Sequence, residues 1–262
     1  MNRYFFKIII PNYNCIEYVE KCIKSVEDQT FKDYILLVID DLSTDGSLDR
    51  VKDLSKQYDN IIIIEPGKKL WNGGTRNIGI HYDIDSEYTM FIDNDDWLNN
   101  NKCLETIYNI IEQNNKPDCV SLSYNCLINN NLSYQPMIRN TQKELVDSLY
   151  VACWTKCIKS NLVVDFPENT LMEDVVQHIK QCDVLETIVS CEEPIIVWNR
   201  NNINSCSRVE NQNKHNGKWK SSMYRYAADL MDLDCNSECC VNHRDWRLEV
   251  VLNNIVKGEY IQ

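Results

Sequence analysis

The first half of the chain alternates short, continuous apolar runs with stretches whose apolar residues recur at helical spacing. Tyr4 to Ile10 is apolar except for Lys7, and Pro11 closes it. Tyr34 to Ile39 and Ile61 to Ile64 are runs of the same kind. Because they are short and lack the alternation of a half-exposed strand, they indicate strands buried on both faces.

Helical patterns lie between these runs. Ile16, Val19, Ile23 and Val26 predict an amphipathic helix that ends near Gln29. Strands that alternate with helices form a mostly parallel sheet with helices on both faces, so the predicted class is α/β and Rossmann-like. The other elements expected here are helices at 48–58, 75–82 and 103–113 and strands at 88–92 and 119–124.

The pattern is looser beyond about residue 125. We expect a loop at 129–131, helices at 145–154 and 173–182, strands at 187–190 and 195–198, and C-terminal helices at 219–233 and 246–256. No repeat and no low-complexity tract interrupts the chain.

Composition excludes some classes of function. The 262 residues carry a net charge of −12, which disfavours a nucleic-acid partner because such binding needs lysine and arginine to displace counterions. The 13 cysteines are odd in number and scattered, and no secretory signal precedes the first strand, which indicates reduced thiols. No apolar run is long enough to span a bilayer. We expect a cytoplasmic protein, attached at most peripherally to the inner face of a membrane.

Acidic residues crowd together directly after the strand at 88–92. Asp93, Asp95 and Asp96 would repel one another unless a cation lies among them. Oxygen ligands of this kind suit Mg²⁺ or Mn²⁺, which commonly share the phosphates of a substrate. The alternative is a solvated turn in which an aspartate caps the next helix.

Two further segments point to the same edge of the sheet. Asp40 and Asp41 follow the second strand, and carboxyl ends of parallel strands open onto one crevice. Gly73 and Gly74 permit close backbone approach, and Arg76 can pair with a phosphate or with the acidic cluster. The alternatives are a capping role for the aspartates and a structural salt bridge for Arg76.

Taken in order, several motifs resemble the family 2 glycosyltransferases of the GT-A fold. The resemblance is specific over roughly the first 105 residues and weaker beyond them. The segments that carry it are Ile9–Asn14, Ser25, Gln29–Thr30, Val38–Ser47, Gly74–Gly79 and Phe91–Leu98, followed more weakly by Trp154–Lys156, Met172–Asp174 and Asn204–Ser205.

The resemblance implies roles on the donor side. Pro11, Tyr13 and Asp41 would line the nucleoside pocket, with Asp41 accepting a hydrogen bond from the base. Arg76 would approach the nucleotide and the acidic motif. The remaining two donor contacts, to the ribose or the diphosphate, would be Asp93 and Asn94. UDP is the nucleotide that the family favours.

The resemblance also implies a metal ligand and a catalytic base. Asp95 would bind Mn²⁺ or Mg²⁺. Asp174 matches the base that removes the proton of an acceptor hydroxyl in an inverting, single-displacement transfer. Without the resemblance, Asp174 is an ordinary aspartate at a helix N-terminus. The expected enzyme is a metal-dependent, hexosyl-type transferase that uses a glycan or lipid-linked acceptor in surface glycan or polysaccharide assembly.

The chain departs from the family pattern at several positions. Leu42 stands where the family usually has glycine, Thr75 where it often has alanine, and the loop at 68–72 is unusual.

The predicted division of the chain is a nucleotide-sugar-binding half at 1–105, an acceptor-binding half of the same domain at 106–215 and a helical extension at 216–262.

Two other functions remain open. A sugar-nucleotide nucleotidyltransferase also places a nucleotide on a parallel sheet, but its Gly-Thr-Arg loop follows the first strand, whereas Gly74 to Arg76 here follows the third. An inactive, carbohydrate-binding relative would not need the retained Asp95 and Asp174.

Three further groups of residues have two possible interpretations each. Trp97 and Trp154 could stack on sugars or fill the core. The cysteines at 235, 239 and 240 with His243 suggest zinc only weakly, and scattered buried thiols are the favoured interpretation. A basic, aromatic stretch at 214–226 could touch a membrane, although a solvated helix face is favoured.

Overall fold

In a computed structural model of the chain, residues 3–147, 151–168, 172–205 and 226–257 are described. Nine strands of these residues form one sheet in the order β3-β2-β1-β4-β8-β6-β9-β5, with β7 paired to β6. The strands are β1 (Tyr4–Asn12), β2 (Tyr34–Asp40), β3 (Ile61–Ile64), β4 (Ser86–Phe91), β5 (Trp97–Leu98), β6 (Cys119–Ile128), β7 (Asn131–Gln135), β8 (Lys156–Lys159) and β9 (Ile188–Asn199).

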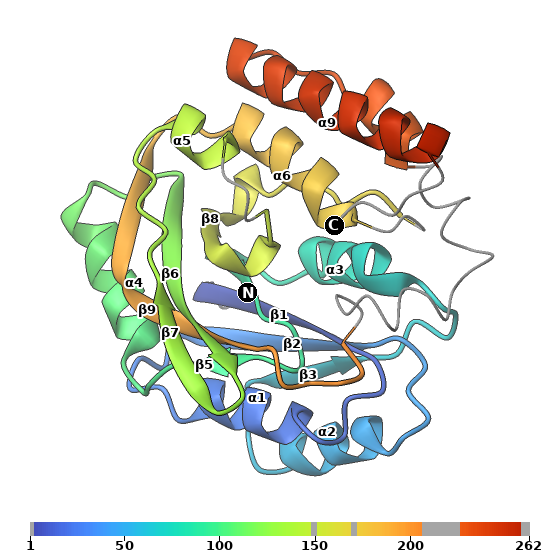
Figure 1. The fold of residues 1–262 in the computed structure, drawn as a ribbon. Helices are drawn as coiled ribbons and strands as arrows, with labels where there is room; N and C mark the ends of the chain where they lie inside the picture. The colour runs from blue at the N-terminus through green and yellow to red at the C-terminus, as the bar shows by residue number, and fades with distance from the viewer. Residues whose placement is uncertain (1–2, 148–150, 169–171, 206–225, 258–262) are drawn as a thin grey trace.

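Helices cover both faces of the sheet, as Figure 1 shows, with α1 and α2 on one side of β1 to β3 and α3 on the other. The helices are α1 (Val19–Glu27), α2 (Ser47–Ser55), α3 (Trp71–His81), α4 (Cys103–Gln113), α5 (Gln142–Val146), α6 (Glu173–Asp183) and α9 (Glu238–Lys257), with 3₁₀ turns η1 (Cys153–Thr155) and η2 (Ser160–Leu162).

The parallel part of the sheet is β3, β2, β1 and β4, and β6 pairs with β9 in parallel as well. β8 is antiparallel to both of its neighbours, β4 and β6. The chain therefore has the predicted mostly parallel α/β fold. β1 lies between β2 and β4, so the order of strands reverses there, which is where ligands bind in open α/β sheets.

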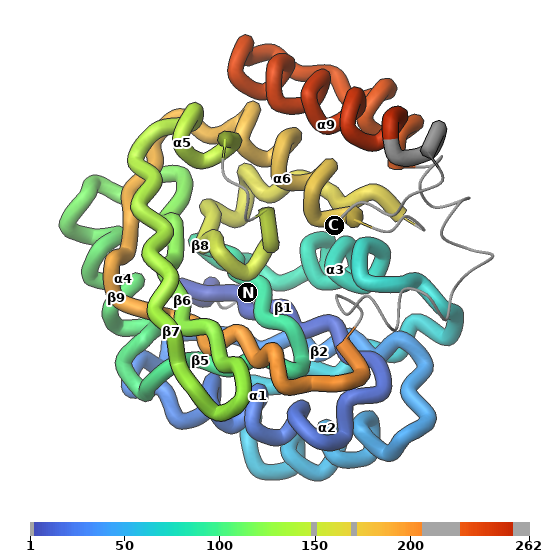
Figure 2. Tube along the Cα trace, in the orientation of Figure 1, coloured from blue at the N-terminus to red at the C-terminus, as the bar shows by residue number. Residues whose placement is uncertain are grey.

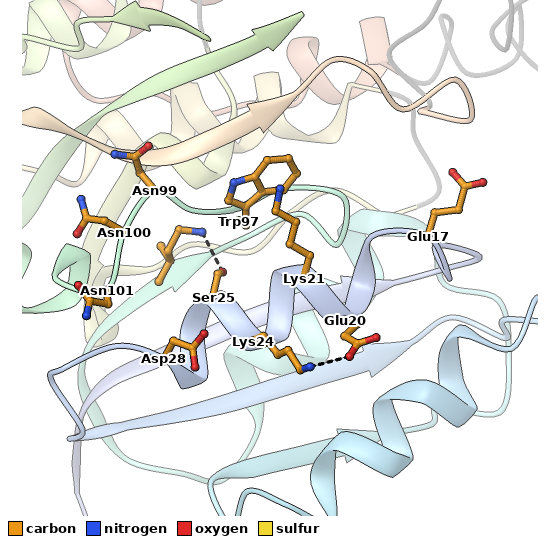
Figure 3. Close-up of a pocket in the computed structure, with 11 residues that line it drawn as sticks. Glu17, Glu20, Lys21, Lys24, Ser25, Asp28, Trp97, Asn99, Asn100 and Asn101 are labelled. Carbon is orange, nitrogen blue, oxygen red and sulfur yellow. Dashed lines mark hydrogen bonds and ion pairs between the residues drawn. The ribbon is translucent and has the colours of Figure 1, made fainter. Parts of the chain in front are cut away.

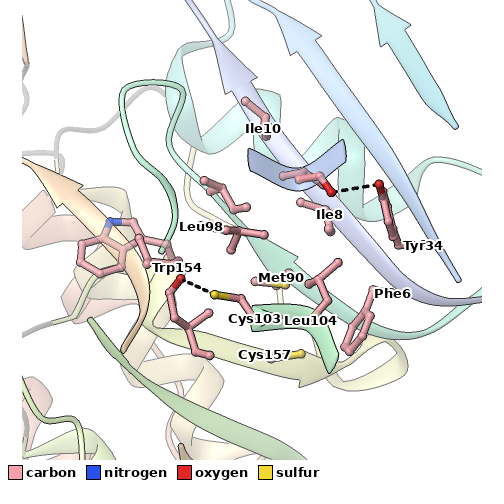
Figure 4. Close-up of a cluster of buried hydrophobic side chains, with 14 of the residues drawn as sticks. Phe6, Ile8, Ile10, Tyr34, Met90, Leu98, Cys103, Leu104, Trp154 and Cys157 are labelled. Atoms are coloured by element: carbon pink, nitrogen blue, oxygen red, sulfur yellow. Dashed lines mark hydrogen bonds between the residues drawn. The ribbon is translucent and has the colours of Figure 1, made fainter. Parts of the chain in front are cut away.

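The continuous apolar runs are buried on both faces, as predicted. Ile8 and Ile10 face the core beneath α1 and α4, whereas Ile9 faces α3, and none of the three has exposed surface. Figure 4 shows the first of these cores, where Met90 and Leu104 pack beside Ile8. Both faces of a parallel strand must be apolar when helices cover them.

The second half of the sheet differs from the expectation in several places. β9 is one strand, not two, because it pairs with β6 on both sides of an irregularity opposite Leu122–Tyr124. The strands β5, β7 and β8 were not predicted, and β7 begins inside the expected loop at 129–131. The expected helix at 145–154 is replaced by α5 and η1, while residues 148–150 lie outside the described part.

α9 is the outermost layer and packs on α5 and α6 (Figure 2). It begins at Glu238 and not at Trp246. The start is fixed by a tertiary contact, since Asp183 at the end of α6 accepts the amide of Ser237 at 2.7 Å, and the Ser237 hydroxyl accepts from the amide of Cys240. Of the expected helix at 219–233, the described part is helical at 226–231. None of the described helices is long and apolar enough to cross a membrane.

Candidate active site

Three neighbouring strands, β1, β2 and β4, end at one edge of the sheet, and Asn12 joins their ends. The Nδ2 of Asn12 donates to Asp40 Oδ1 at 2.7 Å, and its Oδ1 accepts from Asn94 Nδ2 at 2.9 Å. Asn12 is 1% exposed, so water competes little for these bonds. The clusters that follow β2 and β4 therefore meet, as expected. Sequence analysis gave Asn12 no role, although a buried asparagine at a strand end is a usable signal.

Asp41 holds the N-terminus of α3. Its Oδ1 accepts from the Leu70 amide at 2.6 Å, and its Oδ2 accepts from the Trp71 amide at 2.9 Å and from Lys69 Nζ at 2.8 Å. Amides of a first helical turn have no partner within the helix, so a carboxylate stabilises them. The capping role that was left open for this aspartate is thus present. A carboxylate has about four acceptor positions, which leaves room for a donor from a ligand.

Tyr13 and Pro11 differ in what they can offer a ligand. Pro11 is buried in β1 beside β2. Tyr13 is 47% exposed, and the Lys69 ammonium lies over its ring, 2.8 Å from the ring centre. Of Pro11 and Tyr13, Tyr13 is therefore the one with a large accessible face.

Arg76 links the acidic motif to α6. Its Nη2 donates to Asp93 Oδ1 at 2.7 Å and its Nη1 donates to Glu173 Oε1 at 2.8 Å. The guanidinium is 3% exposed, and charge-assisted bonds of this kind are strong where water is excluded. The structure thus brings Arg76 to the acidic motif, as expected. Glu173 is a partner that sequence analysis did not single out, although it stands in the quoted Met172–Asp174 segment.

Close packing of α3 positions Arg76. A Cβ on Gly73 would lie 2.4 Å from the carbonyl oxygen of Pro167, so only glycine fits there. One turn further, Asn77 exchanges two hydrogen bonds with the backbone of Phe166, at 2.8 and 2.9 Å. The start of α3 is therefore fixed against the segment that leads into α6.

The members of the acidic motif have different environments. Asp96 is 1% exposed, and its Oδ1 accepts from the Asn199 amide at 2.8 Å, so it ties the motif to β9. Asp95 accepts from Asn202 Nδ2 at 2.8 Å. Burial and the neighbouring Asp93 raise the pKa of Asp95 to about 6. Asn202 was missed because nothing in its sequence surroundings distinguishes it from other asparagines.

The motif suits a cation that shares its ligands with a phosphate. The described residues contain no group of three acidic, cysteine or histidine side chains placed to hold a metal by themselves. Mg²⁺ and Mn²⁺ sites on phosphate substrates commonly use one or two carboxylates and complete the shell with phosphates and water. Asp95, whose carboxylate is desolvated and repelled by Asp93, fits this kind of site.

Asp174 stands on the first turn of α6, beside Glu173. The helix follows Met172, which has a left-handed φ of 66°, and such strain in a non-glycine residue is frequent near functional sites. Burial raises the pKa of Asp174, the Arg76 charge opposes that rise and the Asp93 charge adds to it. The charges of Arg76 and Asp93 therefore lie close enough to act on the carboxyl group of Asp174.

The buried side chain of Lys156 contacts α6 at His178, one helical turn after Asp174. Lys156 has no exposed surface and donates to the carbonyls of Val151 and Ala152 and to His178 Nδ1, at 3.3, 3.1 and 3.1 Å. His178 is four residues after Asp174 on α6, and burial, aided by Lys156, lowers the pKa of His178 well below its ordinary value. Neutral His178 can therefore accept from Lys156, which ties α6 to the segment before β8.

A groove of about 620 Å³ lies elsewhere, between α1 and residues 97–101. Figure 3 shows Trp97 and Lys21 on its wall, with the Lys21 ammonium 3.2 Å from the centre of the indole ring. None of the expected site residues lines this groove. Trp154, the other tryptophan considered for stacking, is 5% exposed. It packs edge-on against Tyr124, with 4.9 Å between the ring centres, so it belongs to the core.

Two residues considered for zinc, Cys239 and His243, contact side chains of α5 and α9. Cys239 donates to Gln142 Oε1 at 3.3 Å, and His243 accepts from Arg247 at 3.2 Å. Burial, followed by the charge of Arg247, lowers the pKa of His243 to about 4. The basic stretch at 214–226 lies outside the described residues except for its last member.

A family model described as glycosyl transferase family 2 matches residues 7–160, which are more than half of the chain. The chain belongs to glycosyl transferase family 2. The matched residues include the sheet edge with Asn12, Asp41 and Asp95, whereas Asp174 lies beyond them.

Curated proteins and solved structures resemble this chain over different lengths. Poly(ribitol-phosphate) beta-glucosyltransferase of Bacillus spizizenii is 35% identical over 112 residues, which are 41% of this chain but only 17% of that protein. The crystal structure of S. aureus TarS 1–349 in complex with UDP-GlcNAc has a TM-score of 0.71 at 20% identity and covers 97% of this chain and 73% of that chain.

A mannosyltransferase, PcManGT from Pyrobaculum calidifontis in complex with GDP-Man and Mn²⁺, has a TM-score of 0.65 at 13% identity. The match covers 99% of this chain and 77% of that chain. At these identities the structural likeness shows the fold, which is GT-A as expected.

Proposed function

We propose that this glycosyltransferase moves a sugar from a nucleotide-sugar donor, UDP-linked by preference, to an acceptor hydroxyl with inversion at the anomeric carbon. The observation that carries the proposal is the Arg76 bridge between Asp93 and Glu173, at 2.7 and 2.8 Å. It joins the acidic motif after β4 to the helix turn that bears Asp174. We take this shared guanidinium as support for one site that holds both the donor and the acceptor.

The donor would bind along the ends of β1, β2 and β4. Tyr13, Pro11 and Asp41 would contact the nucleoside, and Asp93 and Asn94 the ribose or diphosphate. Arg76 would hold Asp93 in place and add a positive charge near the phosphates. UDP is favoured because the TarS structure is in complex with UDP-GlcNAc. The complex of PcManGT contains GDP-Man, so a guanine nucleotide is the second donor to test.

Asp95 would hold Mn²⁺ or Mg²⁺, with Asp93 next to it. A divalent cation there would neutralise the charge that develops on the leaving diphosphate. The desolvated Asp95 carboxylate, whose pKa burial raises to about 6, supports this assignment because a cation relieves the cost of its burial. The Asn202 amide would keep the carboxylate oriented.

Asp174 would act as the general base. It takes the proton of the acceptor hydroxyl while that oxygen forms a bond with the anomeric carbon, and the bond from that carbon to the diphosphate oxygen breaks. The nucleoside diphosphate leaves with the electron pair. A base is most effective when its pKa is not far below the working pH, and burial moves the pKa of Asp174 upward from its ordinary value.

The acceptor is proposed to be a glycan or lipid-linked hydroxyl in surface glycan assembly. Support comes from the poly(ribitol-phosphate) beta-glucosyltransferase of Bacillus spizizenii, which matches this chain over 112 residues. The donor and acceptor halves at 1–105 and 106–215, the extension at 216–262 and the cytoplasmic location stay predictions.

A transfer assay with a panel of UDP- and GDP-sugars and Mn²⁺ tests the proposal. Asp174→Asn should lower the rate by about 10²- to 10⁴-fold, which is the usual contribution of a general base, and leave donor binding unchanged. Asp165→Asn is the matched control, because Asp165 is exposed and pairs with exposed His81. Near-normal transfer by folded Asp174→Asn would remove Asp174 from the mechanism.

A further inference from the structure

The hairpin of β6 and β7 has an open edge (Figure 1). β7 pairs with β6 over residues 131–135 and with no other strand of the described residues. Its first four residues are exposed, and no described residue outside β6 gives its backbone a backbone hydrogen bond. A strand at the edge of a sheet presents unpaired N–H and C=O groups that can pair with another strand.

The turn of the hairpin determines which backbone groups point outward. Asn129 and Asn130 have φ values of 50° and 62°, as in the two-residue type I′ turn that closes many hairpins. Facing residues then alternate between pairs that exchange hydrogen bonds and pairs that do not, beginning with a bonded pair beside the turn. The N–H and C=O groups of Leu132 and Tyr134 therefore point away from β6.

This hairpin lies in the longest uncharged run of the chain. Residues 119–138 contain no Asp, Glu, Lys, Arg or His, although 25% of all residues are charged. Natural proteins often place charges on edge strands, which hinder pairing with a second molecule. The edge strand β3, for comparison, is flanked by the exposed residues Asp59 and Glu65. β7 lacks that protection.

The charge of the protein favours a second copy of this chain as the partner of β7. Because the net charge is −12, two copies repel each other over most of their surface, and they can approach with least repulsion at an uncharged segment. A basic partner would instead be attracted to the acidic parts of the surface.

The backbone of β7 is also complementary to itself. A twofold axis through Ser133 brings Leu132 opposite Tyr134 of the second copy, and both residues have outward N–H and C=O groups. Each such pair can exchange two hydrogen bonds. Their side chains then lie on the same face of the joined sheet, where facing apolar and aromatic side chains stabilise an antiparallel pair.

We propose that two copies of the chain associate through β7, in antiparallel register about Ser133, so that their sheets form one continuous sheet. The Tyr134 hydroxyl donates to the Glu192 carbonyl on β9, which holds β7 against the sheet before the second copy binds. One strand pair is a small contact, so the dimer is weak and depends on concentration. The proposal is independent of the donor and acceptor proposed above.

Sedimentation equilibrium over a wide concentration series tests the proposal. The unaltered protein should pass from monomer to dimer as its concentration rises. Leu132→Pro removes an outward N–H, a position at which edge strands accept proline, and leaves the bonds to β6 in place. It should weaken the dimer by roughly 5- to 150-fold, because the symmetric contact loses this hydrogen bond twice.

Charges at Ser133 provide a second test. The two Ser133 side chains would face each other across the axis, so Ser133→Lys and Ser133→Glu should each weaken the dimer by several-fold through repulsion. An equimolar mixture of these two variants should associate more tightly than either variant alone. Gln113→Lys is the matched control, because Gln113 is exposed on α4 and the charge change is the same; it should leave the dimer unchanged.

Two results would overturn the proposal. One is a protein that stays monomeric at every concentration. The other is a dimer that the charged variants at Ser133 leave unchanged, because its contact would then lie elsewhere on the surface. Thermal unfolding checks that each variant is folded, and if Leu132→Pro is not, the mixture of the two Ser133 variants decides.

Discussion

The parallel half of the sheet and helix α6 bring carboxylates together by different means. At the ends of β1, β2 and β4, polar groups contact their nearest neighbours in the sheet, as Asn12 contacts Asp40 and Asn94. Glu173, in contrast, reaches Asp93 only through Arg76 on α3. Strand order alone assembles the first group, whereas the second depends on one buried cation.

Arg76→Gln should produce the largest effect on stability. It removes the charge that compensates Glu173 and Asp93 and leaves a buried carboxylate without its partner, which costs about 3–5 kcal/mol of unfolding free energy. Transfer activity should fall with it. Chemical unfolding and the transfer assay measure the two consequences.

Arg50→Gln is the control for that substitution. Arg50 pairs with Glu20 at the surface, and exposed pairs contribute about 1 kcal/mol or less. If the two variants lost equal stability, Arg76 would not be the link between the two halves.

Gly73→Ala should have the next largest effect. Its Cβ would meet the Pro167 carbonyl oxygen at 2.4 Å, and a backbone atom cannot move aside cheaply. Overpacking of this kind costs about 1–3 kcal/mol, and the shift of α3 should reduce transfer. Gly74→Ala is the comparison, because its Cβ would meet only the Leu70 side chain, at 3.0 Å. Equal melting temperatures for the two variants would contradict the close approach.

The pH dependence of transfer reports on Asp174. The base must be ionised, and burial raises its pKa, so kcat at saturating donor and metal should fall on acidification through a pH above the ordinary aspartate value of about 3.9. Saturation keeps the donor-side carboxylates occupied. A kcat that holds constant down to pH 4 would contradict the assignment.

Lys156→Met should give the smallest effect. We expect a shift in the acid limb, which is the part of the pH profile where kcat falls on acidification. The Lys156 charge lowers the pKa of Asp174, so its removal should move the acid limb to higher pH. Lys159→Met is the matched control on β8, because Lys159 pairs with Asp118 at 2.9 Å. If the acid limb of the kcat profile is the same in Lys156→Met as in the unaltered protein, Lys156 has a purely structural role.

Much of the fold could be predicted where periodicity is strong. The buried runs of β1 and β2 were recognised because a parallel strand covered on both faces must be apolar throughout. β8 was missed because its four residues include two lysines and form no apolar run such as that of β3, and β5 because two residues carry no periodic signal. The start of α9 at Glu238 was missed because a contact with Asp183, distant in the chain, fixes it.

The sequence by itself determined which residues stand at the carboxyl ends of β1, β2 and β4, since topology follows from the order of apolar runs and helices. Only the tertiary structure decided that Glu173 pairs with Arg76, that Asn202 donates to Asp95 and that the Lys69 ammonium lies over the Tyr13 ring. The physical reason is that each of these contacts joins side chains from separate elements. Their geometry is set by how the elements pack and leaves no periodic pattern in the chain.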